Sequence, residues 1–204
     1  TLFLEARAGG RVSMDAATSI GSTTANVSLA AVDSGSHFVL PNVAQLTRVN
    51  INASNGGQIS LPAASDYQVG PSGGIIVADG GGSLIHFPSL PALPAATNTI
   101  FLEARNGAEV SLPNVSRIGA ATGLVRVTAF GADSQFTMPS LTEFQNSYLF
   151  AANGANFSIP SVTSWLTNSS VGGIIEANGA GSRLDLPGLT SLSAATNTIF
   201  LEAR

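Results

Sequence analysis

The chain contains no cysteine and no lysine, and charged residues make up only 10% of its 204 residues. The absence of cysteine excludes disulfides and thiolate metal sites. Its eight basic residues are all arginine and its net charge is -4, so no basic stripe is available to meet phosphates and we expect no nucleic-acid partner. The sequence also lacks an apolar run of about eighteen residues and a charged-then-apolar leader, so we expect neither a membrane span nor a signal peptide in it.

What the chain does contain is repetition. The stretch AATNTIFLEAR at 95–105 recurs at 194–204, a shift of 99 residues, and the chain opens on the related TLFLEAR. A shorter unit is marked by a proline, or by an aspartate in its place, at positions 15, 41, 62, 88, 113, 139, 160 and 187. The steps between these positions are 26, 21, 26, 25, 26, 21 and 27 residues, so the order 26, 21, 26 recurs as 26, 21, 27. We therefore expect a single domain over 1–204, with internal repeats of about 1–98 and 99–197 and four short units in each.

Each short unit has the same three parts. An alternating segment ends in alanine, as in IFLEA at 100–104; a second pair precedes the proline, as in VSL at 110–112; apolar residues follow at two and five positions beyond it, as in NVSRI at 114–118. Corners between the first two parts often carry Asn-Gly, at 55–56, 106–107, 153–154 and 178–179. Period-two alternation is typical of strands with one buried face, and Asn-Gly supplies the positive φ of a tight corner.

Stacking these units in parallel gives an all-β fold, a β-solenoid of about eight coils with three short strands per coil. One coil cannot bury enough apolar surface to be stable alone, so neighbouring coils must share ladders and core. The rival is the leucine-rich repeat, whose period overlaps this one. Segments after the proline, such as PSVTSWLTNSSVGG at 160–173, are short and β-branched or Gly-rich, which favours the solenoid. A right-handed parallel β-helix is predicted, because left-handed hexapeptide solenoids keep stricter six-residue steps.

The unit G-x-h-x-h-P-x-h, where h is apolar, resembles the repeats of pectin-lyase-like parallel β-helices and of bacterial surface adhesins. The resemblance covers all eight units but is not specific to one family. It implies an extracellular or cell-surface location, which the low charge also favours.

The outward positions of the first strand are unusually apolar. One column of stacked side chains reads Phe3, Ser28, Asn50, Ile75, Phe101, Arg126, Tyr148, Ile174, Phe200. The next reads Glu5, Ala30, Asn52, Val77, Glu103, Thr128, Phe150, Glu176, Glu202. Such a face is expected to pack on something, either a second solenoid, a neighbouring domain or identical rods. The alternative is a one-residue slip of register in some coils, which would bury these side chains.

No catalytic, cofactor-binding or metal-binding residues are predicted, and we expect no enzyme activity. His37 and His86 fall about two coils apart in different columns, too far to share a metal or a proton. Glu176 and Glu202 form a possible glycosidase-like carboxylate pair, although an ion pair of Glu202 with Arg204 is the simpler interpretation. The same reasoning makes Glu5 with Arg7 and Glu103 with Arg105 exposed ion pairs.

Ice binding is a third class, because a column after the proline ends in three threonines, but Pro91 and Ala44 interrupt it. That column reads Thr18, Ala44, Ser65, Pro91, Ser116, Thr142, Thr163, Thr190.

The sequence therefore predicts a structural or adhesive repeat segment of an extracellular or cell-surface protein or fibre. It begins and ends in the same phase without polar caps, so we expect self-association, lateral or end-to-end, or neighbouring repeats of a longer chain. The alternative is a carbohydrate-binding or polysaccharide-cleaving β-helix.

Overall fold

The computed structural model describes residues 1–94, 98–120, 122–167, 172–195 and 197–204. Residues 95–97 and 196, in the two copies of AATNTIFLEAR, and residues 168–171, in PSVTSWLTNSSVGG, lie outside the described residues. The described part of the chain contains strands and no helix, and the strands pair with one another in parallel ladders. The prediction of an all-β parallel solenoid is confirmed. The leucine-rich alternative is wrong, because the segments after the prolines form strands.

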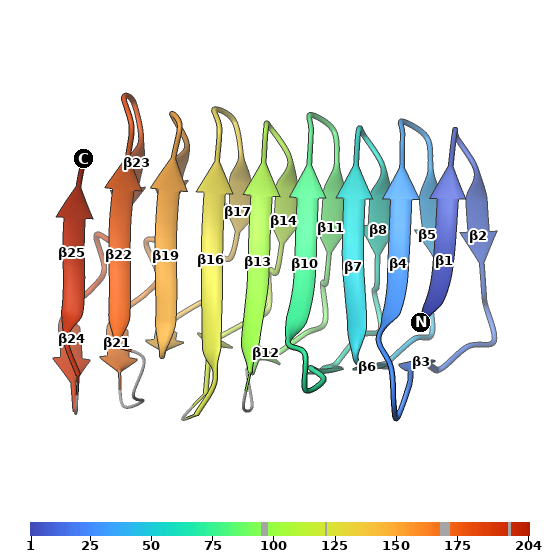
Figure 1. The fold of residues 1–204 in the computed structure, drawn as a ribbon, viewed down its shortest axis with the longest axis horizontal. Coiled ribbons are helices and arrows are strands. Elements are labelled where there is room, and N and C mark those ends of the chain that lie inside the picture. Colours follow the sequence, from blue (N-terminus) through green and yellow to red (C-terminus); the bar gives the residue numbers. More distant parts are fainter. Residues whose placement is uncertain (95–97, 121, 168–171, 196) are drawn as a thin grey trace.

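Three strands per coil build three sheet faces along the rod (Figure 1). The first is a nine-stranded sheet of β1 (Leu2–Arg7), β4 (Val27–Val32), β7 (Val49–Ser54), β10 (Gly74–Asp79), β13 (Thr99–Arg105), β16 (Leu124–Phe130), β19 (Ser147–Ala152), β22 (Gly173–Asn178) and β25 (Ile199–Ala203). The second face holds β2 (Arg11–Ser13), β5 (His37–Val39), β8 (Gln58–Ser60), β11 (Leu84–His86), β14 (Glu109–Ser111), β17 (Gln135–Thr137), β20 (Asn156–Ser158) and β23 (Arg183–Asp185). The third holds β3 (Ser19–Gly21), β6 (Gln45–Thr47), β9 (Asp66–Gln68), β12 (Ala92–Leu93), β15 (Arg117–Ile118), β18 (Glu143–Gln145), β21 (Ser164–Thr167) and β24 (Ser191–Ala194).

The path of the chain is right-handed, as predicted. In Figure 1 the strands of the first sheet run upward in front, and the chain then passes over the top to the second face behind. Successive coils advance from right to left, from β1 to β25. The first sheet is unbroken, whereas the ladder of the third face stops between β9 and β12. β12 lies between Pro91 and Pro94, which have no backbone N–H to donate to a ladder.

Equivalent apolar residues stack along the axis and form one continuous core. The central inward column of the first sheet is fully buried from the second coil to the seventh, and consists of Leu29, Ile51, Ile76, Leu102, Val127 and Leu149. The two apolar positions after the repeat prolines at 41, 62, 88, 113, 139 and 160 are also buried, as for Val115 with Ile118. After Pro187, at the end of the rod, Leu192 is exposed. Aromatic side chains stack between coils in the same way, and the Phe144 and Trp165 ring centroids lie 4.8 Å apart.

The corner between the first and second strands alternates from one coil to the next. Odd coils have three-residue corners that begin with two consecutive residues of positive φ, as in Asn55 (53°) and Gly56 (88°). Even coils have four-residue corners, in which the positive φ values are two residues apart and a serine ends the corner, as in residues 80–83. Asn178-Gly179, grouped above with the other Asn-Gly corners, belongs to the second kind. Asn178 ends β22 and only Gly179 has a positive φ.

The serine of each even corner binds the odd corner before it. The N–H of Gly56 donates to Ser83 Oγ at 2.9 Å, and Ser83 Oγ in turn donates to the carbonyl of Asp79 at 2.6 Å. The same backbone contact recurs at Gly9 with Ser36, Gly107 with Ser134 and Gly154 with Ser182. The structural period of the corner is therefore two coils.

Replacing Ser83 by alanine should lower the free energy of unfolding by about 1–1.5 kcal/mol, because the half-buried N–H of Gly56 loses its acceptor. Ser34, an exposed residue of the preceding even corner, is the matched control, and its alanine variant should stay within about 0.5 kcal/mol of the parent. Urea unfolding followed by circular dichroism measures both. Equal losses at the two positions would show that the serine bridge contributes nothing.

Tyr67 gives the fold a dependence on alkaline pH. Its buried hydroxyl donates to the carbonyl of Val49 at 2.8 Å, and burial raises its pKa above the ordinary value. Unfolded tyrosine ionises near pH ~10 while the folded side chain stays protonated, so this contribution is complete below that pH and is lost as pH rises. Tyr67→Phe should therefore flatten the decline of the urea midpoint above pH ~10. If the urea midpoint of Tyr67→Phe declines as steeply as that of the parent, another group causes the decline. Tyr148 would be one such group, because burial raises its pKa as well.

Candidate interaction surface

The outward side of the nine-stranded sheet, which faces the viewer in Figure 1, carries the predicted apolar columns, and we call it the outer sheet face. The strand registers place both columns as the sequence indicated. Phe101 pairs with Ile75 and Arg126, and Glu103 pairs with Val77 and Thr128. A one-residue slip of register is excluded, because the inward neighbours of these residues are buried.

Large apolar side chains are exposed in the middle of this face. Ile75, Phe101 and Phe130 are 43%, 37% and 38% exposed, so they remain in contact with solvent although coils flank them on both sides. Leu2, Phe3, Phe200 and Leu201 are more exposed, and they lie in β1 and β25 at the two ends of the sheet. Leu192, in β24 of the third face, is 41% exposed. The apolar surface in the middle of the outer sheet face is therefore not a result of core residues left uncovered at the ends of the rod.

Charged residues on the outer sheet face are paired along their own strands. Arg7 Nη2 lies 2.7 Å from Glu5 Oε1, and both side chains are largely exposed, as predicted. Arg204 Nε lies 2.6 Å from Glu202 Oε1, and this hydrogen bond raises the pKa of the arginine. Glu202 is therefore held in an ion pair.

The second carboxylate of the candidate pair is also held by its own strand. Glu176 neighbours Glu202 in the register, and its Oε1 accepts a hydrogen bond from Asn178 Nδ2 at 2.9 Å. The ion pair interpretation of Glu202 with Arg204 is thus confirmed.

The prediction that Glu103 and Arg105 form an exposed pair is wrong. The two side chains do pair, but that of Glu103 is only 8% exposed, against 44% for Glu5 at the equivalent position of the first coil. Neighbouring side chains on both sides cover it, among them Val77 and Thr128. The sequence FLEAR is the same in both copies, so the difference arises from the neighbouring coils.

The cation of Arg126 lies over an aromatic ring on the same face. Its Cζ is 4.5 Å from the centroid of the Phe150 ring, which also makes an edge contact with Tyr148. The positive charge is therefore placed against π-electron density. The nearby Nε of Arg126 and Oγ1 of Thr128 are buried and have no hydrogen-bond partner.

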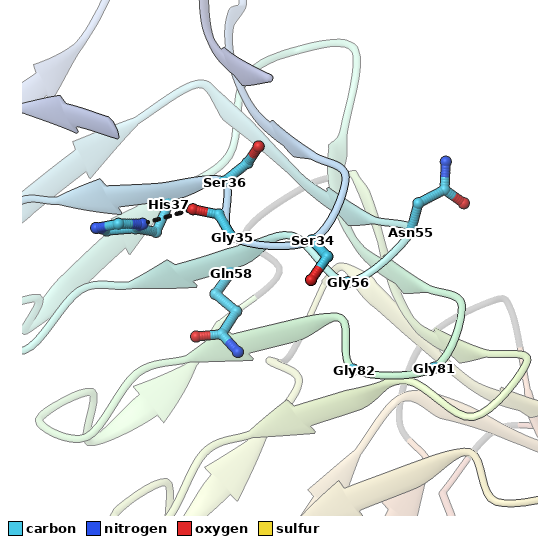
Figure 2. Close-up of a pocket in the computed structure, with 9 residues that line it drawn as sticks. All are labelled: Ser34, Gly35, Ser36, His37, Asn55, Gly56, Gln58, Gly81 and Gly82. Carbon is cyan, nitrogen blue, oxygen red and sulfur yellow. Dashed lines mark hydrogen bonds between the residues drawn. The ribbon is translucent and has the colours of Figure 1, made fainter. Parts of the chain in front are cut away.

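The two histidines lie apart, as predicted, in different columns of β5 and β11. His37 lines a hollow at the first corners of three successive coils, together with small polar residues and glycines (Figure 2). Its Nδ1 donates to the carbonyl of Gly35 at 2.9 Å, since a carbonyl can only accept. Among the described residues, no three His, Cys, Asp or Glu side chains gather where they could hold a metal ion.

The three threonines that end the column on the third face lie in successive coils, as the sequence indicated. Thr142, Thr163 and Thr190 each donate their hydroxyl to the backbone carbonyl of the preceding coil at 3.1–3.3 Å. These hydroxyl hydrogens therefore point along the rod. The expectation that this column is no ice-binding array stays a prediction.

The fold and its surface define a right-handed parallel β-solenoid with an apolar outer sheet face. Comparison of the chain with protein-family models, with curated proteins and with solved structures finds no match. Within the described residues, no helix has the length and apolar character that crossing a bilayer requires.

Proposed function

We propose that this solenoid is a structural or adhesive repeat segment of an extracellular or cell-surface protein or fibre, and that it associates laterally through the outer sheet face. The observation that carries the proposal is the exposure of Ile75, Phe101 and Phe130 in the middle of a flat sheet. Apolar side chains gathered in this way are typical of interaction surfaces. The resemblance to pectin-lyase-like and adhesin repeats supports the extracellular setting.

A second solenoid of the same kind is the partner that fits this face best. Nine strands about 4.8 Å apart, each of about six residues, give a flat area of roughly 43 by 20 Å. That area is close to the roughly 800 Å² per partner that stable pairs bury. Charges on the face are mostly paired along their own strands, as for Arg105 with Glu103, so another flat sheet can approach without opposing a large field of one sign.

The proposal predicts that changes to the face and changes to the ends act differently on association. The double variant Ile75→Ser with Phe101→Ser should sediment as a monomer at concentrations where the parent chain associates, because both side chains leave the apolar patch. The matched variant Leu192→Ser with Leu201→Ser removes two exposed apolar side chains of β24 and β25, at the end of the rod, and should leave lateral association intact.

Sedimentation velocity over a wide range of concentrations distinguishes these outcomes. A parent chain that stays monomeric throughout would overturn lateral association. Loss of association in the Leu192 and Leu201 variant alone would replace it by end-to-end stacking.

Carbohydrate binding is the second candidate function, and one hollow on the outer sheet face favours it. We propose no cleavage, because Glu176 and Glu202 are each held by a neighbour on their own strand.

A further inference from the structure

A hollow of about 290 Å³ lies where β10, β13 and β16 end. It is lined by Asp79, Glu103, Arg105, Asn106, Arg126, Thr128 and Phe130. These residues come from the fourth, fifth and sixth coils, far from the exposed core at either end of the described chain. The hollow therefore belongs to the face of the rod.

Two polar groups in the hollow have no partner. Thr128 is 8% exposed, and its Oγ1 is buried without a hydrogen bond. Arg126 Nε is buried and unbonded as well. Buried polar groups in folded proteins are almost always hydrogen-bonded, so each exception requires an explanation, and at the wall of a cavity a bound ligand is one that can supply the missing partner.

The other polar groups of the hollow are already fixed in place. Glu103 is paired with Arg105, and Asn106 Nδ2 donates to Asp79 Oδ1 at 2.8 Å. Two carboxylates and two guanidiniums balance, counting Arg126, so the hollow has no net charge with which to select an ion. A neutral ligand that both donates and accepts hydrogen bonds suits such a site.

Aromatic rings beside these polar groups narrow the class of ligand. Phe130 lines the hollow, and Phe101 is the neighbour of Arg126 in the adjacent strand. A pyranose ring has an apolar C–H face that packs on such rings and a rim of hydroxyls that can bond Thr128 Oγ1 and Arg126 Nε. We infer that this hollow binds a neutral sugar unit of a glycan.

This inference goes beyond lateral association and is separable from it. A partner seated on the outer sheet face would cover the hollow, so bound sugar and bound partner exclude each other. Sedimentation tests the partner and a titration tests the sugar, so either proposal can fail alone.

The test is a titration of the isotope-labelled protein, followed by amide NMR, with cellohexaose, xylohexaose and maltohexaose, and with trigalacturonate as a charged probe. At least one neutral oligosaccharide should cause saturable shifts at the amides of Asn106, Thr128 and Phe130. Thr128→Val, which keeps the shape of the side chain and removes the hydroxyl, should abolish them. Thr142→Val, on the third face, should leave them unchanged.

A second variant covers a failure of Thr128→Val to fold. Arg126→Met removes Nε and keeps most of the apolar stem, and it should also abolish the saturable shifts. The inference is overturned by an absence of saturable shifts with all three neutral probes, by binding of trigalacturonate alone, or by shifts that persist in both folded variants.

Discussion

Replacing Gly119 by alanine is expected to lower the free energy of unfolding by about 3 kcal/mol or more, since backbone strain and collision act together. Gly119 follows β15 with a φ of 96°, which a residue with a side chain rarely adopts. An added Cβ would collide with the carbonyl oxygen of Gln145 in the next coil. The N–H of Gly119 also donates to the carbonyl of Leu93 in the preceding coil at 3.0 Å, so the backbone cannot move aside without losing a ladder bond.

Gly81 provides the matched control for this variant. An added Cβ there meets no atom within 4 Å, and its φ is not positive. Gly81→Ala should therefore leave the protein unchanged or stabilise it by up to about 1 kcal/mol. Urea unfolding by circular dichroism measures both. Equal midpoints for the two variants would contradict the close approach of coils five and six at Gly119.

Trp165→Ala is expected to have the second large effect, lowering the free energy of unfolding by about 3–5 kcal/mol. The Trp165 side chain is fully buried, and its ring lies 4.8 Å from that of Phe144 in the preceding coil. Removing it opens a cavity against the core of two coils. Neighbouring backbones are held by ladders on both sides, so they cannot collapse into the gap.

Trp165→Phe separates the packing of the ring from its polar group. The indole Nε1 is buried without a hydrogen-bond partner, and phenylalanine removes that unpaired donor while keeping an aromatic ring. The expected loss is below about 1.5 kcal/mol, in line with swaps that largely preserve packing. Thermal unfolding by circular dichroism compares the two variants. If Trp165→Phe lowers the stability as much as Trp165→Ala does, then removing the unpaired Nε1 donor brings no compensating gain in stability.

The sequence was sufficient to predict the coils and the register of their strands. The spacing of the prolines predicted eight coils, and the alternation in IFLEA and its counterparts predicted which side chains of the first strand face inward. Both follow from a strand period of two and from the need of each coil to bury the same positions, so one aligned unit determines all the others. The same logic placed Phe101 and Glu103 on the outer sheet face.

The alternation of corners was missed although its signal is present. Four segments, DSGS at 33–36, GGGS at 80–83, GADS at 131–134 and GAGS at 179–182, mark the even corners. Only the last residue, serine, is the same in all four. The shared serine has a role only when the preceding coil is in place, as for Ser83 with Gly56. An Asn-Gly signal is local, whereas this one needs two coils.

The hollow and the burial of Glu103 could not be read from the sequence for a related reason. Glu5 and Glu103 lie in nearly identical strands, and only their neighbours in the adjacent coils differ. How deeply a side chain is buried on an outward face depends on whether strands flank it on both sides and on the size of the neighbouring side chains. Glu5 lies in the edge strand β1 beside Ala30 alone, whereas Glu103 lies between Val77 and Thr128. Neighbours in the adjacent coils also determine that the Thr128 hydroxyl is buried without a hydrogen-bond partner.

The central claim is that equivalent residues form straight columns on the outer sheet face, one layer per coil. Because the chain has no cysteine, pairs of spin labels can be attached to introduced cysteines at Asn52, Glu176 and Glu202, with Glu5 as a further site. Asn52 is five layers from Glu176 and six from Glu202, and Glu5 is eight layers from Glu202. Pulsed electron paramagnetic resonance should give separations of about 24, 29 and 38 Å, in proportion to the number of layers. Separations that do not grow by about 4.8 Å per layer would contradict the stacked columns and, with them, the interaction surface.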